Sequence, residues 1–258
     1  MDTGYQVALI TGASSGFGRS IAFRLADQKL KLVLLARRED RLKALAAELS
    51  SRTECRVIAA DVRDQAAVKA ALDALPSGWR EIDVLVNNAG LALGLAPADK
   101  ADWADWEQMI QTNCAALAWL TRQLLPGMVE RRRGHVVMLG SIAGEYAYPG
   151  GNVYGATKAF VAQFARNLRA DILGSGVRVT NVEPGLVGGS EFSLVRFKGD
   201  ARKAAQVYEG ADPLLPEDVA EAVAWAIAQP ARVDIASIEM MPVTQAHGPL
   251  AVHRKKPA

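Results

Sequence analysis

Three side chains with complementary chemistry lie in the middle of the chain: Ser141, Tyr154 and Lys158. Tyr154 and Lys158 are four residues apart, and apolar residues recur at helical spacing over residues 153–173, so the phenol and the ammonium are expected on one helix face. A free phenol has a pKa of about 10, and a positive charge close to it favours the phenolate. The pair therefore predicts an acid-base catalyst. The alternative is an ordinary surface tyrosine beside a solvated lysine.

A glycine-rich turn follows the first apolar run. Residues 7–10 are expected to form a buried strand and residues 19–28 a helix, with Gly12, Gly16 and Gly18 between them. Glycine permits positive φ and lets a phosphate approach the backbone, and the amides that open a helix donate to an anion. The spacing is a T-G-x-x-x-G-x-G variant of the dinucleotide-binding turn, in a unit that returns to a second apolar strand. The turn therefore predicts a dinucleotide site.

Strand-like and helix-like runs alternate along the rest of the chain. This alternation predicts crossover units and a parallel sheet, so the fold class is α/β. At 258 residues and 50% apolar content, one domain over residues 1–258 is expected. The expected strands are residues 7–10, 31–35, 56–60, 84–86, 135–139, 178–182 and 237–241.

The motifs together resemble one family, the short-chain dehydrogenase/reductases, over nearly the whole chain. The resemblance implies a single-domain Rossmann fold: a doubly wound, seven-stranded parallel sheet with helices on both faces. It also implies an oxidoreductase that passes a hydride between a nicotinamide dinucleotide and a carbon atom. The residues that carry the resemblance are Thr11 to Gly18, Asp61 and Val62, Asn87 to Gly90, Asn113, Ser141, Tyr154 with Lys158, and Pro184 with Gly185.

The choice between the two nicotinamide dinucleotides is expected at the end of the second strand. An acidic residue there would hydrogen-bond the ribose of NAD(H) and repel a 2′-phosphate, but this chain has Arg37 and Arg38. Guanidinium groups form charge-assisted contacts with phosphate, so the pair favours NADP(H). The alternative is two solvated arginines paired with Glu39 and Asp40 at a helix start.

The resemblance also implies how the rest of the cofactor is held. The glycine-rich turn faces the phosphates, Asp61 and Val62 flank the adenine, and residues 88–90 lie under its ribose. After Gly185 the chain departs from the family, because the threonine that touches the nicotinamide carboxamide is displaced; either Ser190 or backbone amides take that contact. The implied cofactor-binding residues are Gly12, Ala13, Ser14, Ser15, Gly16, Phe17, Gly18, Arg37, Arg38, Asp61, Val62, Asn88, Ala89, Gly90, Tyr154, Lys158, Pro184, Gly185, Leu186, Val187 and Ser190.

Four residues have implied catalytic roles. Tyr154 would donate a proton to a carbonyl oxygen in reduction, or remove it from an alcohol in oxidation, while Ser141 hydrogen-bonds the same oxygen. Lys158 would lower the tyrosine pKa and bind the nicotinamide ribose. Asn113 would hold a water molecule that links the lysine to solvent. The alternatives are a strand-end cap for Ser141 and a polar helix residue for Asn113.

The substrate is expected under residues 186–215, which lack clear periodicity after the sixth strand and are interpreted as a lid. Local strings resemble a narrower group of the family, which oxidises small 3-hydroxy acids such as serine, allo-threonine and 3-hydroxypropionate with NADP(H). Arg196 and Lys198 would supply the counter-charge and bind the substrate with Ser141 and Tyr154. The alternative is solvent-facing charges on a mobile loop. A related group reduces sulfoacetaldehyde, whose sulfonate would suit the same arginine.

Composition and charge limit the kinds of partner that are expected. Net charge is +2 with both signs mixed, so neither nucleic acid nor a membrane surface is expected. The first strand begins within ten residues, which leaves no room for a signal peptide and favours the cytoplasm. Cys55 and Cys114 have no metal-ligand spacing, so both are expected to be buried free thiols and no catalytic metal is expected.

Assembly and regulation are less defined by the sequence. The resemblance implies a homotetramer, formed in part by the long helices expected near residues 105–129 and 153–173. The tail at residues 245–258 either is disordered or reaches a neighbouring subunit's site. A different class, a dinucleotide-sensing regulator without turnover, is opposed by the intact Asn113, Ser141, Tyr154 and Lys158.

Overall fold

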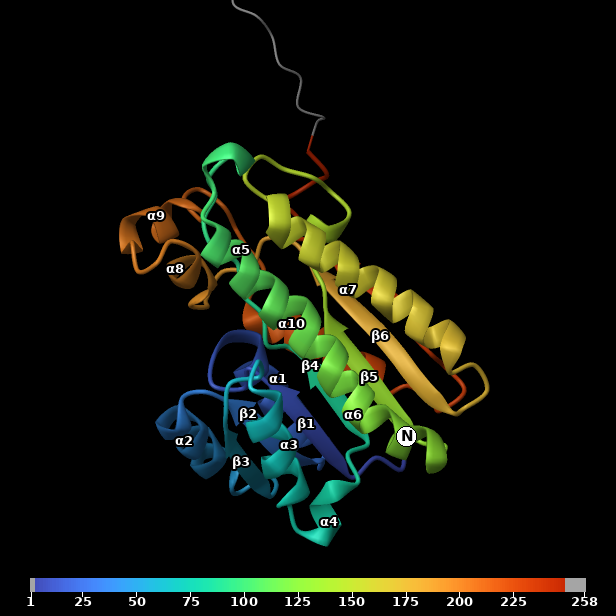
Figure 1. The fold of residues 1–258 in the computed structure, drawn as a ribbon. Helices are drawn as coiled ribbons and strands as arrows, with labels where there is room; N and C mark the ends of the chain where they lie inside the picture. The colour runs from blue at the N-terminus through green and yellow to red at the C-terminus, as the bar shows by residue number, and fades with distance from the viewer. Residues whose placement is uncertain (1–2, 249–258) are drawn as a thin grey trace, which may run out of the picture.

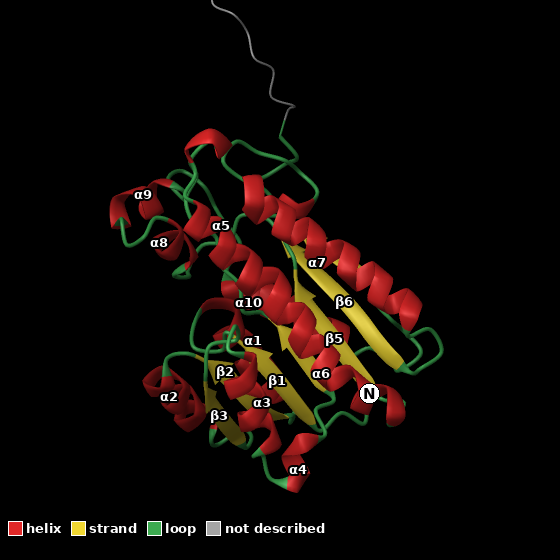
Figure 2. Ribbon diagram, in the orientation of Figure 1, coloured by secondary structure: helices red, strands yellow, loops and turns green. Residues whose placement is uncertain are grey.

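The computed structural model describes residues 3–248, and its centre is one seven-stranded sheet (Figures 1 and 2). All neighbouring strands are parallel, in the order β3-β2-β1-β4-β5-β6-β7. The chain builds outward from β1, returns to the middle, and then builds outward in the other direction, so the doubly wound prediction is confirmed. The strands are β1 Val7–Thr11, β2 Lys31–Ala36, β3 Cys55–Ala59, β4 Val84–Asn87, β5 Gly134–Leu139, β6 Val177–Pro184 and β7 Ser237–Met240.

Helices cover both faces of the sheet. Ten are α-helices, within the described residues, and three further helical turns are η1 Ala98–Lys100, η2 Gln111–Ala116 and η3 Ile142–Gly144. The α-helices are α1 Gly16–Asp27, α2 Glu39–Leu49, α3 Gln65–Asp73, α4 Ser77–Arg80, α5 Trp103–Ile110, α6 Leu117–Glu130, α7 Asn152–Asp171, α8 Phe192–Arg196, α9 Ala201–Gln206 and α10 Pro216–Ile227.

Alternate residues of β1 show how the two layers form. Ala8 and Ile10 pack in a core with α1, α2 and α10, whereas Val7 and Leu9 pack in a second core with α3, α4, α6 and α7. A parallel sheet covered on both faces needs apolar side chains at successive positions, which is why β1 reads as one apolar run. None of the helices in residues 3–248 is long and apolar enough to cross a membrane.

Residues 186–215, which are predicted to form the substrate lid, contain regular structure. They include the two short helices α8 and α9, which lie beyond the carboxyl ends of the strands, beside α5 (Figure 1). These helices have five and six residues, fewer than two turns, and so they cannot show helical periodicity in the sequence. The absence of clear periodicity is therefore compatible with both helices, and the role of this segment as a lid stays a prediction.

The long helix expected near residues 105–129 is interrupted. It consists of α5, the π-helical turn η2 and α6, and Asn113 lies in η2. A π turn widens the backbone path, and such turns occur often at functional sites. The interruption therefore singles out the segment that carries Asn113.

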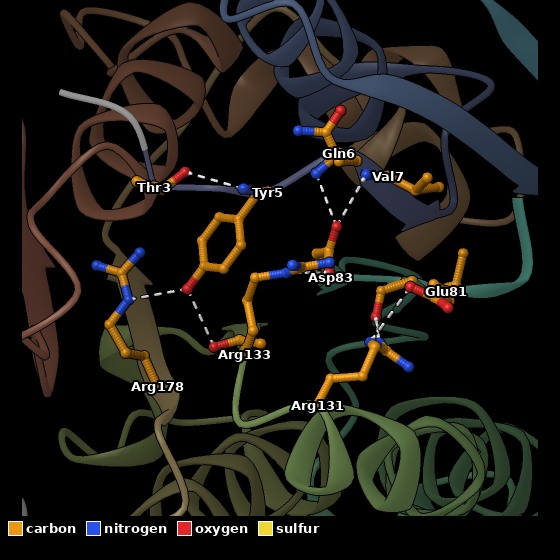
Figure 3. A network of polar contacts seen from close by, with 11 residues as sticks. Thr3, Tyr5, Gln6, Val7, Glu81, Asp83, Arg131, Arg133 and Arg178 are labelled. Carbon is orange, nitrogen blue, oxygen red and sulfur yellow. Dashed lines mark hydrogen bonds and ion pairs between the residues drawn. The ribbon is translucent and has the colours of Figure 1, made fainter. Parts of the chain in front are cut away.

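Buried charged residues anchor the amino ends of β1, β4 and β6 (Figure 3). Arg178, at the start of β6, donates to the Tyr5 hydroxyl at 3.1 Å and to the Ile227 carbonyl at 2.7 Å, at the carboxyl end of α10. Asp83, just before β4, accepts from the Arg133 guanidinium at 2.9 Å and from two backbone amides at the start of β1. These contacts fix the strands whose other ends carry the site.

Candidate active site

The three side chains singled out first come together at the end of β5. Ser141 follows that strand and opens η3, where its hydroxyl accepts from the Ala143 amide at 3.1 Å and also hydrogen-bonds Tyr154. On α7, the Lys158 ammonium lies 5.8 Å from the centre of the Tyr154 ring and donates to the Leu139 carbonyl at 2.7 Å. Ser141 thus caps the turn, which was the alternative role, and its role towards a substrate oxygen stays a prediction.

Burial dominates the electrostatics of this group. Tyr154 and Lys158 are each 8% exposed. Burial raises the pKa of Tyr154 to about 12, opposed by the hydrogen bond from Ser141 and by the charge of Arg196. Burial likewise lowers the pKa of Lys158 to about 8. The charge of Arg196 thus lowers the pKa of Tyr154 in this structure, and the influence expected of Lys158 stays a prediction.

Asn113 braces the segment that follows β4 against α7. Its side-chain oxygen accepts from the Leu91 amide at 2.9 Å, and its amide nitrogen donates to the Leu91 carbonyl at 2.9 Å and to the Thr157 hydroxyl at 3.0 Å. Both amide hydrogens are thus taken by protein groups. A water molecule that links Lys158 to solvent therefore cannot accept a hydrogen bond from these two amide hydrogens.

The glycine-rich turn joins β1 to α1 beside β4. Gly12 has a φ of +66° and Gly16 a φ of +51°, values that favour glycine. The helix α1 begins without a side-chain cap, so its first amides can donate to a phosphate. The Thr11 hydroxyl accepts from the Asn88 and Ala89 amides at 3.0 and 2.9 Å, which fixes residues 88–90 where the strand order reverses.

A cationic cluster lies beside this turn. Arg38 donates to the Ser14 hydroxyl at 3.2 Å, to the Ser15 hydroxyl at 2.8 Å and to the Glu191 carboxylate at 2.8 Å. Arg41 donates to the other Glu191 oxygen at 3.0 Å. Arg41 and Glu191 were not predicted. The three-residue spacing of Arg38 and Arg41 could have indicated Arg41, but nothing close to it in sequence indicates Glu191.

The alternative pairing expected for these arginines is not what the structure shows. Glu39 pairs with Lys43 at 2.7 Å, one helical turn further along α2. Among residues 3–248, neither Glu39 nor Asp40 forms an ion pair with Arg37 or Arg38. Arg37 itself is exposed at the end of β2.

The two predicted substrate-binding cations have different surroundings. Arg196 donates to the Tyr148 hydroxyl at 2.8 Å and to the Gly94 carbonyl at 3.2 Å, and its guanidinium carbon lies 5.5 Å from the centre of the Tyr154 ring. Lys198 instead pairs with Asp105 at 2.8 Å, and within the described part of the chain it has no contact with Tyr154. The structure therefore brings Arg196 to the site and leaves Lys198 out.

The adenine end of the expected site has its own ion pair. The Asp61 carboxylate pairs with Arg63 at 2.7 Å, and the hydrogen bond from Arg63 holds the pKa of Asp61 below its usual range. Val62 is partly buried against the core on the α3 side of the sheet. Both residues follow β3, as the sequence placed them.

At the nicotinamide end, the segment after β6 passes over the glycine-rich turn. A Cβ added to Gly16 would lie 3.3 Å from the Cβ of Ser190, so the two segments are in contact. The Leu186 amide donates to the side-chain oxygen of Gln245 at 2.7 Å. Gln245 was not predicted as a site residue, because it is 59 residues away in sequence. Residues 249–258 of the expected tail lie outside the described residues.

A cavity of about 670 Å³ separates the glycine-rich turn and α2 from α8 and α9. Its walls include Ser15, Arg41, Glu191 and Tyr208, but Tyr154 does not line it. Within residues 3–248, no group of three or more His, Cys, Asp or Glu side chains could hold a metal ion. The arginines, serine hydroxyls and uncapped helix start form a donor set that suits a dinucleotide phosphate.

Comparison with known proteins agrees with this geometry. The family described as short chain dehydrogenase matches residues 6–196, and the chain belongs to that family. It is 55% identical over 248 residues to the NADP-dependent 3-hydroxy acid dehydrogenase of Salmonella typhi, covering 96% of this chain and 99% of that protein. It is 48% identical over 249 residues to sulfoacetaldehyde reductase 2 of Chromohalobacter salexigens, covering 96% and 98%.

A solved structure extends this result to three dimensions. The closed form of serine dehydrogenase complexed with NADP+ superposes with a TM-score of 0.93 at 53% identity, covering 97% of this chain and 100% of that one. The predicted family and fold are confirmed, and the predicted cofactor is the one that these relatives' names carry. The chain is thus a dehydrogenase of the short-chain family, acting on alcohol groups.

Proposed function

We propose that the protein interconverts a small 3-hydroxy acid and its semialdehyde or ketone with NADP(H). The observation that carries this proposal is the position of Arg196, 5.5 Å from the Tyr154 ring and held by Tyr148. A fixed cation beside the proton donor suits a substrate whose carboxylate lies a few bonds from its reacting oxygen. The names of the Salmonella typhi relative and the serine dehydrogenase structure support the same substrate class.

The chain's own residues would supply proton transfer and orientation. The bound nicotinamide supplies or accepts the hydride. In oxidation, Tyr154 takes the hydroxyl proton as the hydride leaves carbon; in reduction it returns that proton to the oxygen. Ser141 holds the oxygen, and Lys158, anchored at the end of β5, binds the nicotinamide ribose. Asn113 keeps η2 against α7.

The cofactor would lie along the edge formed by the carboxyl ends of the strands. The first amides of α1 and residues 12–18 hold the pyrophosphate, and Arg37 and Arg38 hold the 2′-phosphate. Asp61 and Val62 flank the adenine, and residues 88–90 support its ribose. Residues 184–187 and Ser190 line the nicotinamide. The uncapped start of α1 and the contacts of Arg38 support this arrangement.

Replacing Arg38 with alanine is expected to weaken NADPH binding by roughly 10- to 100-fold and to leave NADH binding within about twofold. A charge-assisted contact to the 2′-phosphate would be lost, and NADH has no such group. Fluorescence titration of both cofactors measures the two dissociation constants. The exposed Arg232 provides the control. Equal losses for NADPH and NADH would remove Arg38 from the phosphate site.

The substrate class is tested by initial rates of NADP+ reduction with L-serine, L-allo-threonine and 3-hydroxypropionate. NADPH oxidation is measured beside them with malonate semialdehyde and sulfoacetaldehyde. Turnover of the 3-hydroxy acids supports the proposal. A strong preference for sulfoacetaldehyde would favour the second candidate, a sulfoacetaldehyde reductase, which the Chromohalobacter salexigens relative supports because Arg196 suits a sulfonate equally well. No turnover of any substrate would contradict both and favour a dinucleotide-sensing regulator.

Replacing Arg196 with glutamine is expected to raise the KM for 3-hydroxy acids by roughly 10- to 100-fold, because the substrate anion would lose its charge-assisted partner. Turnover of an uncharged alcohol should change much less. Lys198 provides a matched control, since its ammonium pairs with Asp105. If Lys198→Gln impairs the acids as strongly as Arg196→Gln, the counter-charge is wrongly assigned.

We further propose that the protein is a cytoplasmic homotetramer. Both cysteines, Cys55 and Cys114, are free thiols, which supports a reducing compartment. Exposed apolar side chains on the helices expected at the interface support assembly, among them Trp103 at 66% exposure and Phe160 at 41%. Light scattering coupled to size exclusion measures the mass in solution.

A further inference from the structure

The first lid helix, α8, is held at both of its ends. At its carboxyl end, Arg196 bonds to Tyr148 and Gly94 on the substrate side. At its amino end, Glu191 bonds to Arg38 and Arg41 on the cofactor side. The substrate lid is thus tied directly to the arginine cluster beside the glycine-rich turn.

Glu191 is an anion placed inside that cluster. One carboxylate oxygen accepts from Arg38 at 2.8 Å and the other from Arg41 at 3.0 Å. The hydrogen bonds from Arg38 and Arg41 hold the pKa of Glu191 below its usual range, so the carboxylate is ionised at neutral pH. Arg38 points its remaining donors at Ser14 and Ser15.

A 2′-phosphate would need the same donors. It carries about −1.5 to −2 charges near neutral pH, and a carboxylate already bonded to the arginines repels it. We propose that Glu191 competes with the 2′-phosphate of NADP(H) for Arg38 and Arg41, so that binding of this phosphate releases the amino end of α8. Discrimination between NADP(H) and NAD(H) is then coupled to the substrate lid, because a cofactor without the phosphate leaves the Glu191 contacts in place.

The surroundings of Glu191 allow this movement. The cavity of about 670 Å³ borders Glu191 and extends towards Ser193 and Tyr208 of the lid. A displaced carboxylate can therefore move without entering a packed core. The contacts of Arg196 hold the other end of α8, so the movement is expected to begin at the amino end and to loosen the lid from there.

The inference rests on the proposed 2′-phosphate site, and its first test uses fragments that lack the nicotinamide. Dissociation constants are measured for adenosine 2′,5′-bisphosphate and for adenosine 5′-monophosphate. Glu191→Gln is expected to tighten the bisphosphate by about three- to tenfold, because two half-exposed ion pairs no longer compete. The monophosphate should change by less than about twofold. The control is Glu39→Gln. It also removes one negative charge close to Arg38, but the Glu39 carboxylate pairs with Lys43 rather than with Arg38 or Arg41.

The second test is limited proteolysis of the wild-type protein and of two Glu191 variants. Trypsin can cleave the lid after Lys198, Arg202 or Lys203, which are exposed. The bisphosphate is expected to speed cleavage of the wild-type lid several-fold, whereas the monophosphate should not. Glu191→Gln should be cleaved rapidly without either fragment, and Glu191→Asp should restore part of the protection.

Contrary outcomes distinguish failure of this inference from failure of the proposed phosphate site. If the bisphosphate protects the wild-type lid, or if Glu191→Gln leaves bisphosphate affinity unchanged, Glu191 does not compete with the phosphate and the inference is overturned. If Arg38→Ala also leaves the preference for the bisphosphate unchanged, the proposed phosphate site fails first. If Arg38→Ala loses the preference for the bisphosphate while Glu191→Gln has no effect, the phosphate site stands and only the inference about Glu191 is overturned.

Discussion

Replacement of Tyr154 with phenylalanine is expected to lower kcat by roughly 10²- to 10⁴-fold, the usual contribution of a positioned acid or base. The phenol is buried against Ser141, and burial raises its pKa to about 12, so it is protonated at neutral pH and ready to donate in reduction. Oxidation needs the phenolate and is expected to quicken as pH rises towards that value. Phenylalanine has no proton to transfer in either direction.

Cofactor binding should survive this change. The ring packs edge-on against Phe192 at 5.8 Å, and phenylalanine retains that contact. NADPH titration is expected to give a dissociation constant within a few-fold of the wild type, while single-turnover rates fall with kcat. Tyr146→Phe is the control, since the ring of this tyrosine stacks on that of His247 at 4.0 Å. Normal turnover by Tyr154→Phe would show that another group transfers the proton.

Replacement of Arg178 with methionine is expected to lower the free energy of unfolding by about 3–5 kcal/mol. Methionine keeps much of the aliphatic bulk, but it leaves the Tyr5 hydroxyl and the carbonyls of Ala226 and Ile227 without this donor. It also removes a positive charge from the carboxyl end of α10, where the helix dipole favours a cation. Arg178 is 3% exposed, so water cannot readily replace the guanidinium.

Urea denaturation at one fixed protein concentration measures this loss, because assembly would otherwise shift the midpoint. Arg232→Met removes the same charge from an exposed position and is expected to change stability by less than about 0.5 kcal/mol. Similar midpoints for both variants would show that the buried contacts of Arg178, one of the residues drawn in Figure 3, do not stabilise the fold.

Local signals account for much of what was predicted. The strands β1, β2 and β4 are short apolar runs, because the middle of a parallel sheet is buried on both faces. Tyr154 and Lys158 share one helix, so their proximity follows from a spacing of four residues. The helices α8 and α9 escaped prediction because segments this short owe their form to packing rather than to periodicity.

The sequence by itself determined the fold class, the family, the glycine-rich turn and the candidate catalytic group, since each depends on residues close together in the chain. Only the tertiary structure decided which long side chains meet. Glu191 reaches Arg38 across 153 residues, Arg196 reaches Tyr148 across 48, and Lys198 turns to Asp105 instead of the site. The physical reason is that parallel strands bring their carboxyl ends to one edge, where loops distant in sequence become neighbours.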